Sequence, residues 1–226
     1  MTAVEPITRT YRLAMGVCAL AVRWWGRLEV SGLEHLPLSG PVLLAANHDS
    51  YWDPVAIGIA ALRSRQIRAL AKSSMWKVRG LGRILDGMGQ IPIERGAGDA
   101  RALDRAVSEL ARGACIGVFP EGTRSLGRTL RARSGLGRLA LAVPQAQVIC
   151  ATVQGTVDIA RFPKRPRVRV RFFVPAADSH ALGDVRNAAD LPIRLLAEIR
   201  REAPIASAGR GARTDQPPPT GANPPT

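Results

Sequence analysis

Two periodicities of hydrophobic and polar positions divide the chain into predicted helices and strands. Apolar residues recur at helical spacing in 5–27, 99–112, 135–143 and 191–202. Short apolar runs have the length of strands at 41–46, 67–71, 90–93, 114–119 and 148–153, and 167–174 alternates arginine with valine. Strands that alternate with helices predict a single α/β domain, with a mostly parallel central sheet flanked by helices.

A strand, a polar loop and a helix follow one another early in the chain. The apolar run 41–46 ends at Asn47 and His48. Asp53 and Pro54 then stand where a helix would begin, with the aspartate as its N-cap and the proline at its first position. We therefore expect the polar loop at the carboxyl end of a buried strand.

The first predicted helix has a short apolar stretch, 13–22, with arginines before it and arginines and tryptophans after it. This stretch is about half of the ~20 residues that span a bilayer, and no secretory cleavage site follows it. Its flanks favour a helix in the lipid headgroup layer, and a helix docked on the domain's own core is the alternative. The predicted division is an interfacial helix at 1–27, a single domain at 28–203, and a disordered Pro- and Gly-rich tail at 204–226.

The net charge changes this picture more than the rest of the composition does. Apolar residues make up an ordinary 46%, whereas the net charge is +14, almost all of it from arginine. Such a charge favours nucleic acid, an anionic membrane surface or a phosphorylated substrate. The arginines are dispersed, aromatic residues are only 4%, and no nucleic-acid motif is visible, so nucleic acid is disfavoured. Three scattered cysteines imply no disulfide framework and fit a reducing, cytoplasmic setting.

The polar loop carries a histidine and an aspartate five positions apart, His48 and Asp53. Such a carboxylate can meet one ring nitrogen, fix the tautomer, and stabilise the imidazolium once the other nitrogen takes a proton. No nucleophile-elbow pattern surrounds Ser50, so we expect His48 to deprotonate a substrate hydroxyl that attacks an activated carbonyl directly. The alternative is structural, with a local hydrogen bond at His48 and an N-cap at Asp53.

A second polar segment, 119–125, reads Phe-Pro-Glu-Gly-Thr-Arg-Ser directly after a predicted buried strand. The carboxyl ends of strands are where α/β sheets place their ligands. Gly122 lets the backbone approach a ligand, Thr123 offers a hydroxyl, and Arg124 offers a fork that matches phosphate oxygens. The alternative is a turn with a surface arginine.

Three segments together, Asn-His-x4-Asp at 47–53, Gly-x-Ile-x-Ile-x-Arg at 89–95 and the motif at 119–125, resemble the glycerolipid acyltransferase superfamily in order and separation. The 1-acylglycerol-3-phosphate acyltransferase branch is the most similar, and the resemblance covers roughly 28–175. It implies an α/β layer structure with an N-terminal helical element on the membrane. It also implies transfer of a fatty acyl group from acyl-CoA or acyl carrier protein to the free hydroxyl of 1-acyl-sn-glycerol 3-phosphate, giving phosphatidic acid without an acyl-enzyme.

The resemblance further implies roles for single residues. His48 would be the general base, and Asp53 would orient it. Arg95 and Arg124 would hold the acceptor's phosphate, and Glu121 would bind the acceptor's glycerol portion or brace the loop. The residues implied to bind substrate are Lys72, Arg95, Glu121, Gly122, Thr123 and Arg124, and Arg133 and Gly135 match a basic-x-Gly element that follows the third motif in many relatives.

The implied partners are a lysophospholipid acceptor, acyl-CoA or acyl carrier protein, and an anionic membrane surface, with no nucleic acid and no metal or redox cofactor. The expected location is the cytoplasmic face of the cell membrane, as a peripheral or monotopic protein. Another lysolipid or glycerol 3-phosphate is the alternative acceptor. The alternative of another class is a non-catalytic basic protein that binds membranes or nucleic acid, which the charge of +14 and the arginine-rich segment 165–171 would favour.

Overall fold

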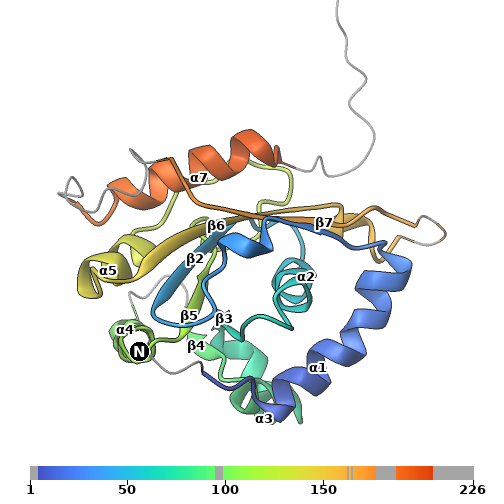
Figure 1. Ribbon diagram of the computed structural model, residues 1–226, viewed down its shortest axis with the longest axis horizontal. Helices are drawn as coiled ribbons and strands as arrows, with labels where there is room; N and C mark the ends of the chain where they lie inside the picture. The colour runs from blue at the N-terminus through green and yellow to red at the C-terminus, as the bar shows by residue number, and fades with distance from the viewer. Residues whose placement is uncertain (1–4, 95–98, 162, 164, 177–186, 206–226) are drawn as a thin grey trace, which may run out of the picture.

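A seven-stranded sheet forms the centre of the computed structural model, which describes residues 5–94, 99–161, 163, 165–176 and 187–205 (Figure 1). The strands are β1 Glu29–Ser31, β2 Val42–Ala46, β3 Ile67–Lys72, β4 Ile91–Ile93, β5 Cys115–Val118, β6 Gln147–Gln154 and β7 Arg169–Phe173. Their order across the sheet is β1-β7-β6-β2-β5-β3-β4. The strands from β6 to β4 are parallel, whereas β7 is antiparallel to β6, and β1 is parallel to β7. The prediction of a mostly parallel sheet is therefore confirmed.

Helices cover both faces of this sheet (Figure 1). They are α1 Arg9–Ala19 with its π-helical continuation η1 Leu20–Trp25, α2 Asp53–Ala60, α3 Leu81–Gly87, α4 Ala100–Ala111, α5 Gly135–Ala142 and α7 Asp190–Glu202, and the 3-10 turns are η2 Leu33–His35, η3 Ser73–Lys77 and η4 Thr156–Asp158. Adjacent residues of β2 pack into the two different helical layers. Leu44 packs in the core that α1 and α2 share, and Leu43 packs in the core of α4, α5 and α7. Both residues are fully buried, which explains why β2 is a continuous apolar run.

The neighbouring strands β6, β2, β5 and β3 are parallel, so their carboxyl ends lie at one edge of the sheet. In register, Ala45 lies between Val118 of β5 and Cys150 of β6. The loops that follow these three strands are therefore neighbours in space although they are far apart in the sequence. This edge is where parallel α/β sheets place ligands.

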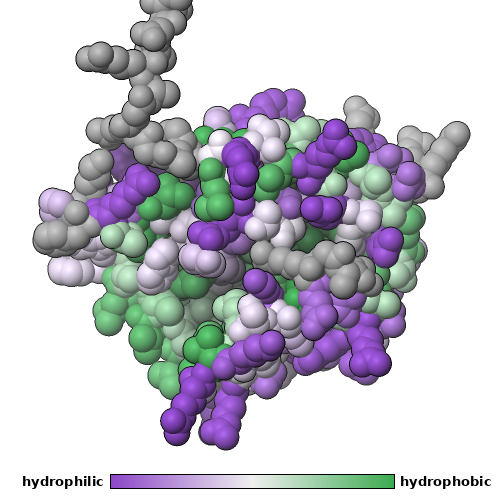
Figure 2. All heavy atoms as spheres, turned by 180° about the vertical axis from the view of Figure 1, so that it is seen from behind, coloured by the Kyte–Doolittle hydropathy of each residue, from purple (hydrophilic) through white to green (hydrophobic). Residues whose placement is uncertain are grey.

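The predicted N-terminal helix is amphipathic, and one of its faces packs on the domain's own core. Tyr11, Met15 and Val22 on the inner face of α1 and η1 belong to the hydrophobic core. The outer face exposes a stripe of apolar side chains, visible as hydrophobic atoms at the lower left of Figure 2. The stripe consists of Leu13, Val17, Leu20 and Trp24, each at least 64% exposed. In the described part of the chain, no helix is both long enough and apolar enough to cross a bilayer.

Two elements have no counterpart in the sequence prediction, β1 and α3. β1 has three residues, all exposed, so it has no hydrophobic pattern that could reveal it. α3 covers only two turns and buries Gly82 and Leu85 alone, which is too little periodicity for a helix prediction. Of the tail that we expected to be disordered, residues 206–226 lie outside the described part of the chain.

Candidate active site

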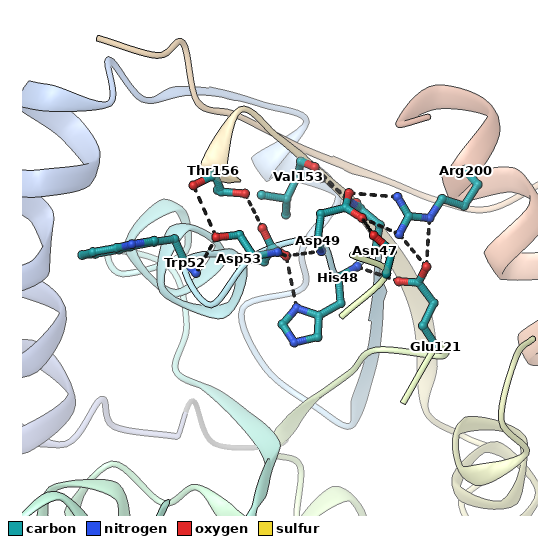
Figure 3. A network of polar contacts seen from close by, with 11 residues as sticks. Asn47, His48, Asp49, Trp52, Asp53, Glu121, Val153, Thr156 and Arg200 are labelled. Atoms are coloured by element: carbon teal, nitrogen blue, oxygen red, sulfur yellow. Dashed lines mark hydrogen bonds and ion pairs between the residues drawn. The ribbon is translucent and has the colours of Figure 1, made fainter. Parts of the chain in front are cut away.

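The predicted pair of His48 and Asp53 meets at the carboxyl edge of the sheet (Figure 3). Nδ1 of His48 lies 3.1 Å from Oδ2 of Asp53, and both residues are buried. A carboxylate only accepts hydrogen bonds, so this contact places the ring proton on Nδ1 and leaves Nε2 as an acceptor. In Figure 3, Nε2 points away from the other labelled side chains. The arrangement is that of a general base with its orienting carboxylate.

The carboxylate of Asp53 does not cap the helix that it begins. Oδ2 accepts the backbone N–H groups of Asp49 at 2.6 Å and Ser50 at 2.7 Å, which precede α2, and Oδ1 accepts the hydroxyl of Thr156. Trp52 occupies the cap position, and its side chain makes no capping bond. The N-cap prediction for Asp53 is therefore wrong, because four donors outside the helix turn the carboxylate back toward the loop.

Neighbouring strands hold both the ring and the backbone of His48. The ring stacks on Phe119 at the end of β5, with centroids 4.2 Å apart and planes inclined by 20°. The carbonyl of His48 accepts the N–H of Ser125 at 2.8 Å. Asn47 exchanges two hydrogen bonds of 2.8 Å with the backbone of Val153 in β6. The imidazole is thus fixed by the loops after β2 and β5 together, anchored on β6.

Glu121 holds the backbone of His48 in place. It is 2% exposed, and its Oε2 accepts the backbone N–H of His48 at 2.8 Å. Oε1 accepts Nε of Arg200 at 3.1 Å and Nη2 at 2.5 Å. The same guanidinium makes two bonds of 2.9 Å to the carboxylate of Asp49. Both oxygens of Glu121 thus accept hydrogen bonds from within the protein, which is the geometry of the bracing role, one of the two that the sequence left open.

Burial and pairing act differently on the two carboxylates that Arg200 joins. Burial raises the pKa of Glu121, and the hydrogen bond from Arg200 only partly offsets this. Burial also acts to raise the pKa of Asp49, but the hydrogen bonds from Arg200 and Ser125 outweigh it, so the pKa of Asp49 lies below its usual value. Asp49 is therefore firmly ionised. The ionised form of Glu121 depends more strongly on the hydrogen bond from Arg200.

A cavity of about 490 Å³ opens beside the imidazole. His48, Lys72, Thr123 and Arg124 all lie on its wall, so the structure brings four of the predicted residues to one site. The guanidinium of Arg124 lies 3.5 Å above the ring of Tyr51. Most of the remaining wall is apolar and comes from α1, α2, β3 and α3, with Tyr11, Met15, Ile57, Ile67, Leu85 and Met88 among its residues. The imidazole, two cationic side chains and an apolar wall thus surround one cavity.

Gly122, another predicted substrate residue, is not on the wall of this cavity. Gly122 has a φ of +69°, and a Cβ there would come within 3.0 Å of Cγ of Arg133, so this glycine shapes the loop and does not line the cavity. Arg133 also donates its N–H to the carbonyl of Pro120 at 2.7 Å. Arg95 lies outside the described part of the chain.

The described side chains offer no activated nucleophile next to the base. The hydroxyl of Ser50 is buried and donates to the carbonyl of Thr156 at 3.3 Å. Burial raises the pKa of Cys115 to about 12 and also raises that of Cys150, which disfavours both thiolates. The arrangement suits proton removal from a substrate hydroxyl better than covalent catalysis.

Sequence reasoning missed three residues that build the site. Phe119 opens the 119–125 motif, and an aromatic residue at a strand end was a signal for ring stacking. Thr156 follows Gly155 directly after β6, so the turn after a buried strand was a signal for a ligand-edge residue. Arg200 lies 151 positions after Asp49 on the last helix, and no local pattern distinguishes it from the other arginines.

Comparisons with known proteins give a matching family and similar sequences. The model of a family described as Acyltransferase matches residues 27–154. A 1-acyl-sn-glycerol-3-phosphate acyltransferase of Bacillus subtilis is 24% identical over 115 residues, which are 51% of this chain and 57% of that protein. A lyso-ornithine lipid O-acyltransferase of Pseudomonas aeruginosa is 33% identical over 120 residues, which are 50% of this chain and 45% of that protein. The chain thus matches about half the length of these relatives.

Solved structures with a similar fold include the crystal structure of the 1-acyl-sn-glycerophosphate (LPA) acyltransferase, PlsC, from Thermotoga maritima, with a TM-score of 0.61. The superposition covers 87% of this chain and 83% of that one, at 19% identity. Because the superposition covers 87% of this chain, the likeness in fold extends beyond residues 27–154.

Proposed function

Because the chain belongs to the acyltransferase family, we propose that it transfers a fatty acyl group from acyl-CoA or acyl carrier protein to the free hydroxyl of 1-acyl-sn-glycerol 3-phosphate, giving phosphatidic acid. The observation that carries this proposal is the position of His48, with its free Nε2 on the wall of a cavity that is apolar on one side and carries Arg124 and Lys72 as well. A lysolipid acceptor has matching parts, namely a hydroxyl, an acyl chain and a phosphate.

In the proposed reaction, Nε2 of His48 takes the proton of the acceptor hydroxyl while the hydroxyl oxygen attacks the thioester carbon. Asp53, bonded to Nδ1 at 3.1 Å, stabilises the imidazolium that forms. The tetrahedral intermediate then collapses, the carbon–sulfur bond breaks, and the imidazolium returns its proton to the thiolate. An ester and a free thiol result, and no acyl-enzyme forms. General base catalysis of this kind supplies on the order of 10²–10⁴ in rate.

Two relatives with different acceptors in their names make the acceptor the main question. The test mixes the protein with acyl-CoA, or with acylated carrier protein, and a panel of 1-acyl-sn-glycerol 3-phosphate, lyso-ornithine lipid and glycerol 3-phosphate. Thiol release and the mass of the lipid product are followed together. We expect the fastest release with 1-acyl-sn-glycerol 3-phosphate and a product of phosphatidic acid mass. Absence of thiol release with every donor and acceptor pair would favour a non-catalytic binding protein. Faster thiol release with lyso-ornithine lipid would show that this lipid, and not 1-acyl-sn-glycerol 3-phosphate, is the preferred acceptor.

Arg124 provides a test of phosphate binding. It lies on the cavity wall with His48, and a charge-assisted hydrogen bond contributes about 1.5–3 kcal/mol. We expect Arg124→Ala to raise the KM for a phosphorylated acceptor by about 10- to 100-fold, with the KM for the acyl donor within about twofold. Initial rates measured with each substrate varied in turn provide the comparison.

The matched control is Arg128→Ala, which removes an exposed arginine from the same loop but not from the cavity wall. It should leave both KM values unchanged. A second comparison uses a monoacylglycerol acceptor, whose KM should not respond to Arg124→Ala because it has no phosphate. If Arg124→Ala raised the KM for the donor and the KM for the acceptor equally, Arg124 would not be the group that binds the acceptor's phosphate.

We further propose that the exposed stripe of α1 and η1 rests on an anionic membrane surface at the cytoplasmic face, as a peripheral or monotopic contact. The stripe is flanked by the exposed arginines Arg9, Arg12, Arg23 and Arg27, and Arg165 lies 5.4 Å from the ring of Trp24. Apolar side chains between cationic ones match the boundary between acyl chains and anionic headgroups. The contact would hold the cavity close to its lipid substrate.

Exposed side chains of the stripe allow a test that leaves the core intact, unlike a deletion of α1. Leu13 and Leu20 are 71% and 73% exposed. Because burying one leucine side chain contributes about 1.5–3 kcal/mol, the double variant Leu13→Gln/Leu20→Gln should lose at least about tenfold in partitioning to vesicles of anionic and zwitterionic lipid. The control is Ile193→Gln, an exposed apolar residue of α7, on the opposite side of the sheet from α1. If the double variant sedimented with vesicles as well as the wild type does, the proposal of an interfacial helix would be wrong.

A further inference from the structure

We propose that Arg200 is a positioning residue for the base, acting as a clamp that joins the two loops on which the location of His48 depends; this inference rests on the proposed function. Arg200 lies on α7, beyond residues 27–154 that match the family. Its guanidinium reaches from the last helix to the loops after β2 and β5 (Figure 3). No other described basic side chain bridges these two loops by ion pairs of 4.0 Å or less.

The clamp reaches His48 by two routes. On one side, Nη1 and Nη2 bind the carboxylate of Asp49, the residue that follows His48, at 2.9 Å each. On the other side, Nε and Nη2 bind Oε1 of Glu121, whose second oxygen accepts the N–H of His48. The base is therefore held through its own backbone and through its neighbour, both by one guanidinium.

Burial makes this clamp depend on the shape of arginine. The side chains of Arg200, Asp49 and Glu121 are 13%, 7% and 1% exposed. A planar fork with five N–H donors can bind two carboxylates at once, whereas a lysine ammonium is a point charge on a flexible stem. Without the guanidinium, two buried carboxylates would face each other with no cation between them. They would separate, and the loops that carry them would separate with them.

The consequence concerns the rate of the chemical step. A misplacement of about 1 Å in a reacting group costs on the order of 10²-fold in rate. Arg200 does not line the cavity, so it has no direct contact with a substrate there. Its loss should therefore lower kcat and leave substrate binding nearly unchanged, which separates a positioning residue from a phosphate-binding one such as Arg124.

The first experiment compares Arg200→Gln, Arg200→Lys and wild type by kcat and KM. We expect Arg200→Gln to lower kcat by about 10²-fold, with both KM values within about threefold. Arg200→Lys should recover only part of this loss, because it restores the charge without the fork. The matched control is Arg201→Gln, the exposed neighbour on the same helix, which should behave as wild type. Full activity in a folded Arg200→Gln, or in Arg200→Lys, would overturn the clamp.

If Arg200→Gln does not fold, the double variant Arg200→Gln/Glu121→Gln provides the test. It removes one positive and one negative charge, so the net charge of the cluster stays as in the wild type, and the glutamine at 121 still offers an oxygen to the N–H of His48. We expect this variant to fold and to lose about 10²-fold in kcat. Recovery of wild-type kcat would show that Arg200 only neutralises charge, and the positioning role would be rejected.

A second measurement does not depend on activity. The amide of His48 donates to Glu121, and the amide of Ala69 in β3 donates to Oε1 of Gln90 at 2.9 Å, a bond in which no residue of the clamp takes part. In Arg200→Gln, hydrogen exchange at His48 should accelerate at least tenfold more than at Ala69. Equal acceleration would indicate a general loss of stability and would overturn the clamp. If wild type transfers no acyl group at all, the proposed function fails, yet this exchange result still decides the clamp.

Discussion

Replacing His48 by alanine should lower kcat for acyl transfer by about 10²–10⁴-fold, the range that general base catalysis supplies. Nε2 of His48 is the acceptor on the cavity wall, and Nδ1 is held by Asp53 at 3.1 Å. Without the ring, the acceptor hydroxyl must lose its proton to water while it attacks the thioester. The KM values should change little, because the ring contributes little to the binding of an acyl chain or a phosphate. Thiol release under saturating donor and acceptor measures the effect.

The chain offers a matched control in His35, whose side chain is 46% exposed and lies in η2. His35→Ala removes the same group from a position outside the cavity and should keep full activity. Thermal unfolding of both variants tests whether a loss of fold causes any loss of activity. Phe119 stays in place beside the vacated ring position in His48→Ala, so we expect a folded protein. A folded His48→Ala that retains most of its activity would disprove the base, even if the chain is an acyltransferase.

The sequence predicted the parts of the fold that repeat along the chain. β2 and β5 are runs that are buried on both faces, and α4 has one apolar face with Asp99 accepting the N–H of Ala102 at its start. These elements follow from local periodicity and capping, so their bounds were found to within a few residues. The order of chain segments then implied a parallel sheet, and the parallel sheet placed the loops after β2 and β5 at one edge.

What the sequence could not reveal depends on contacts between distant segments. Arg200 is one of many arginines, and only the packing of α7 on the sheet brings it to Asp49 and Glu121. The N-cap position assigned to Asp53 was wrong for the same reason. Its local pattern is that of an N-cap, and the donor from Thr156, 103 positions away, is invisible to local reasoning. Motif residues were therefore predictable as candidates, and so was the local pair of His48 and Asp53, whereas partners from distant segments were not.

Asp53→Ala should combine a large loss of kcat with a large loss of stability. The carboxylate accepts hydrogen bonds from His48, the backbone of Asp49 and Ser50, and Thr156, and it is fully buried. Each buried donor left without a partner costs about 1–3 kcal/mol, so the free energy of unfolding should fall by several kcal/mol. The imidazole also loses the group that fixes its tautomer, and kcat should fall by about 10²–10⁴-fold. Thermal unfolding and thiol release measure the two effects.

Asp53→Asn separates these two losses. The N–H groups of Asp49 and Ser50 require an acceptor at the position of Oδ2, so the amide oxygen should occupy it and the NH2 group should face the hydroxyl of Thr156, which can accept. Nδ1 of His48 then keeps its acceptor and its tautomer, but the negative charge is gone. We expect most of the stability of the wild type and a kcat lower by about 10- to 100-fold, since a hydrogen bond to a charged group contributes about 1.5–3 kcal/mol. The exposed Asp104 of α4 provides the control, Asp104→Asn. If Asp53→Asn were as active as wild type while Asp53→Ala unfolded, Asp53 would support the loop alone, and the imidazolium would not depend on its charge.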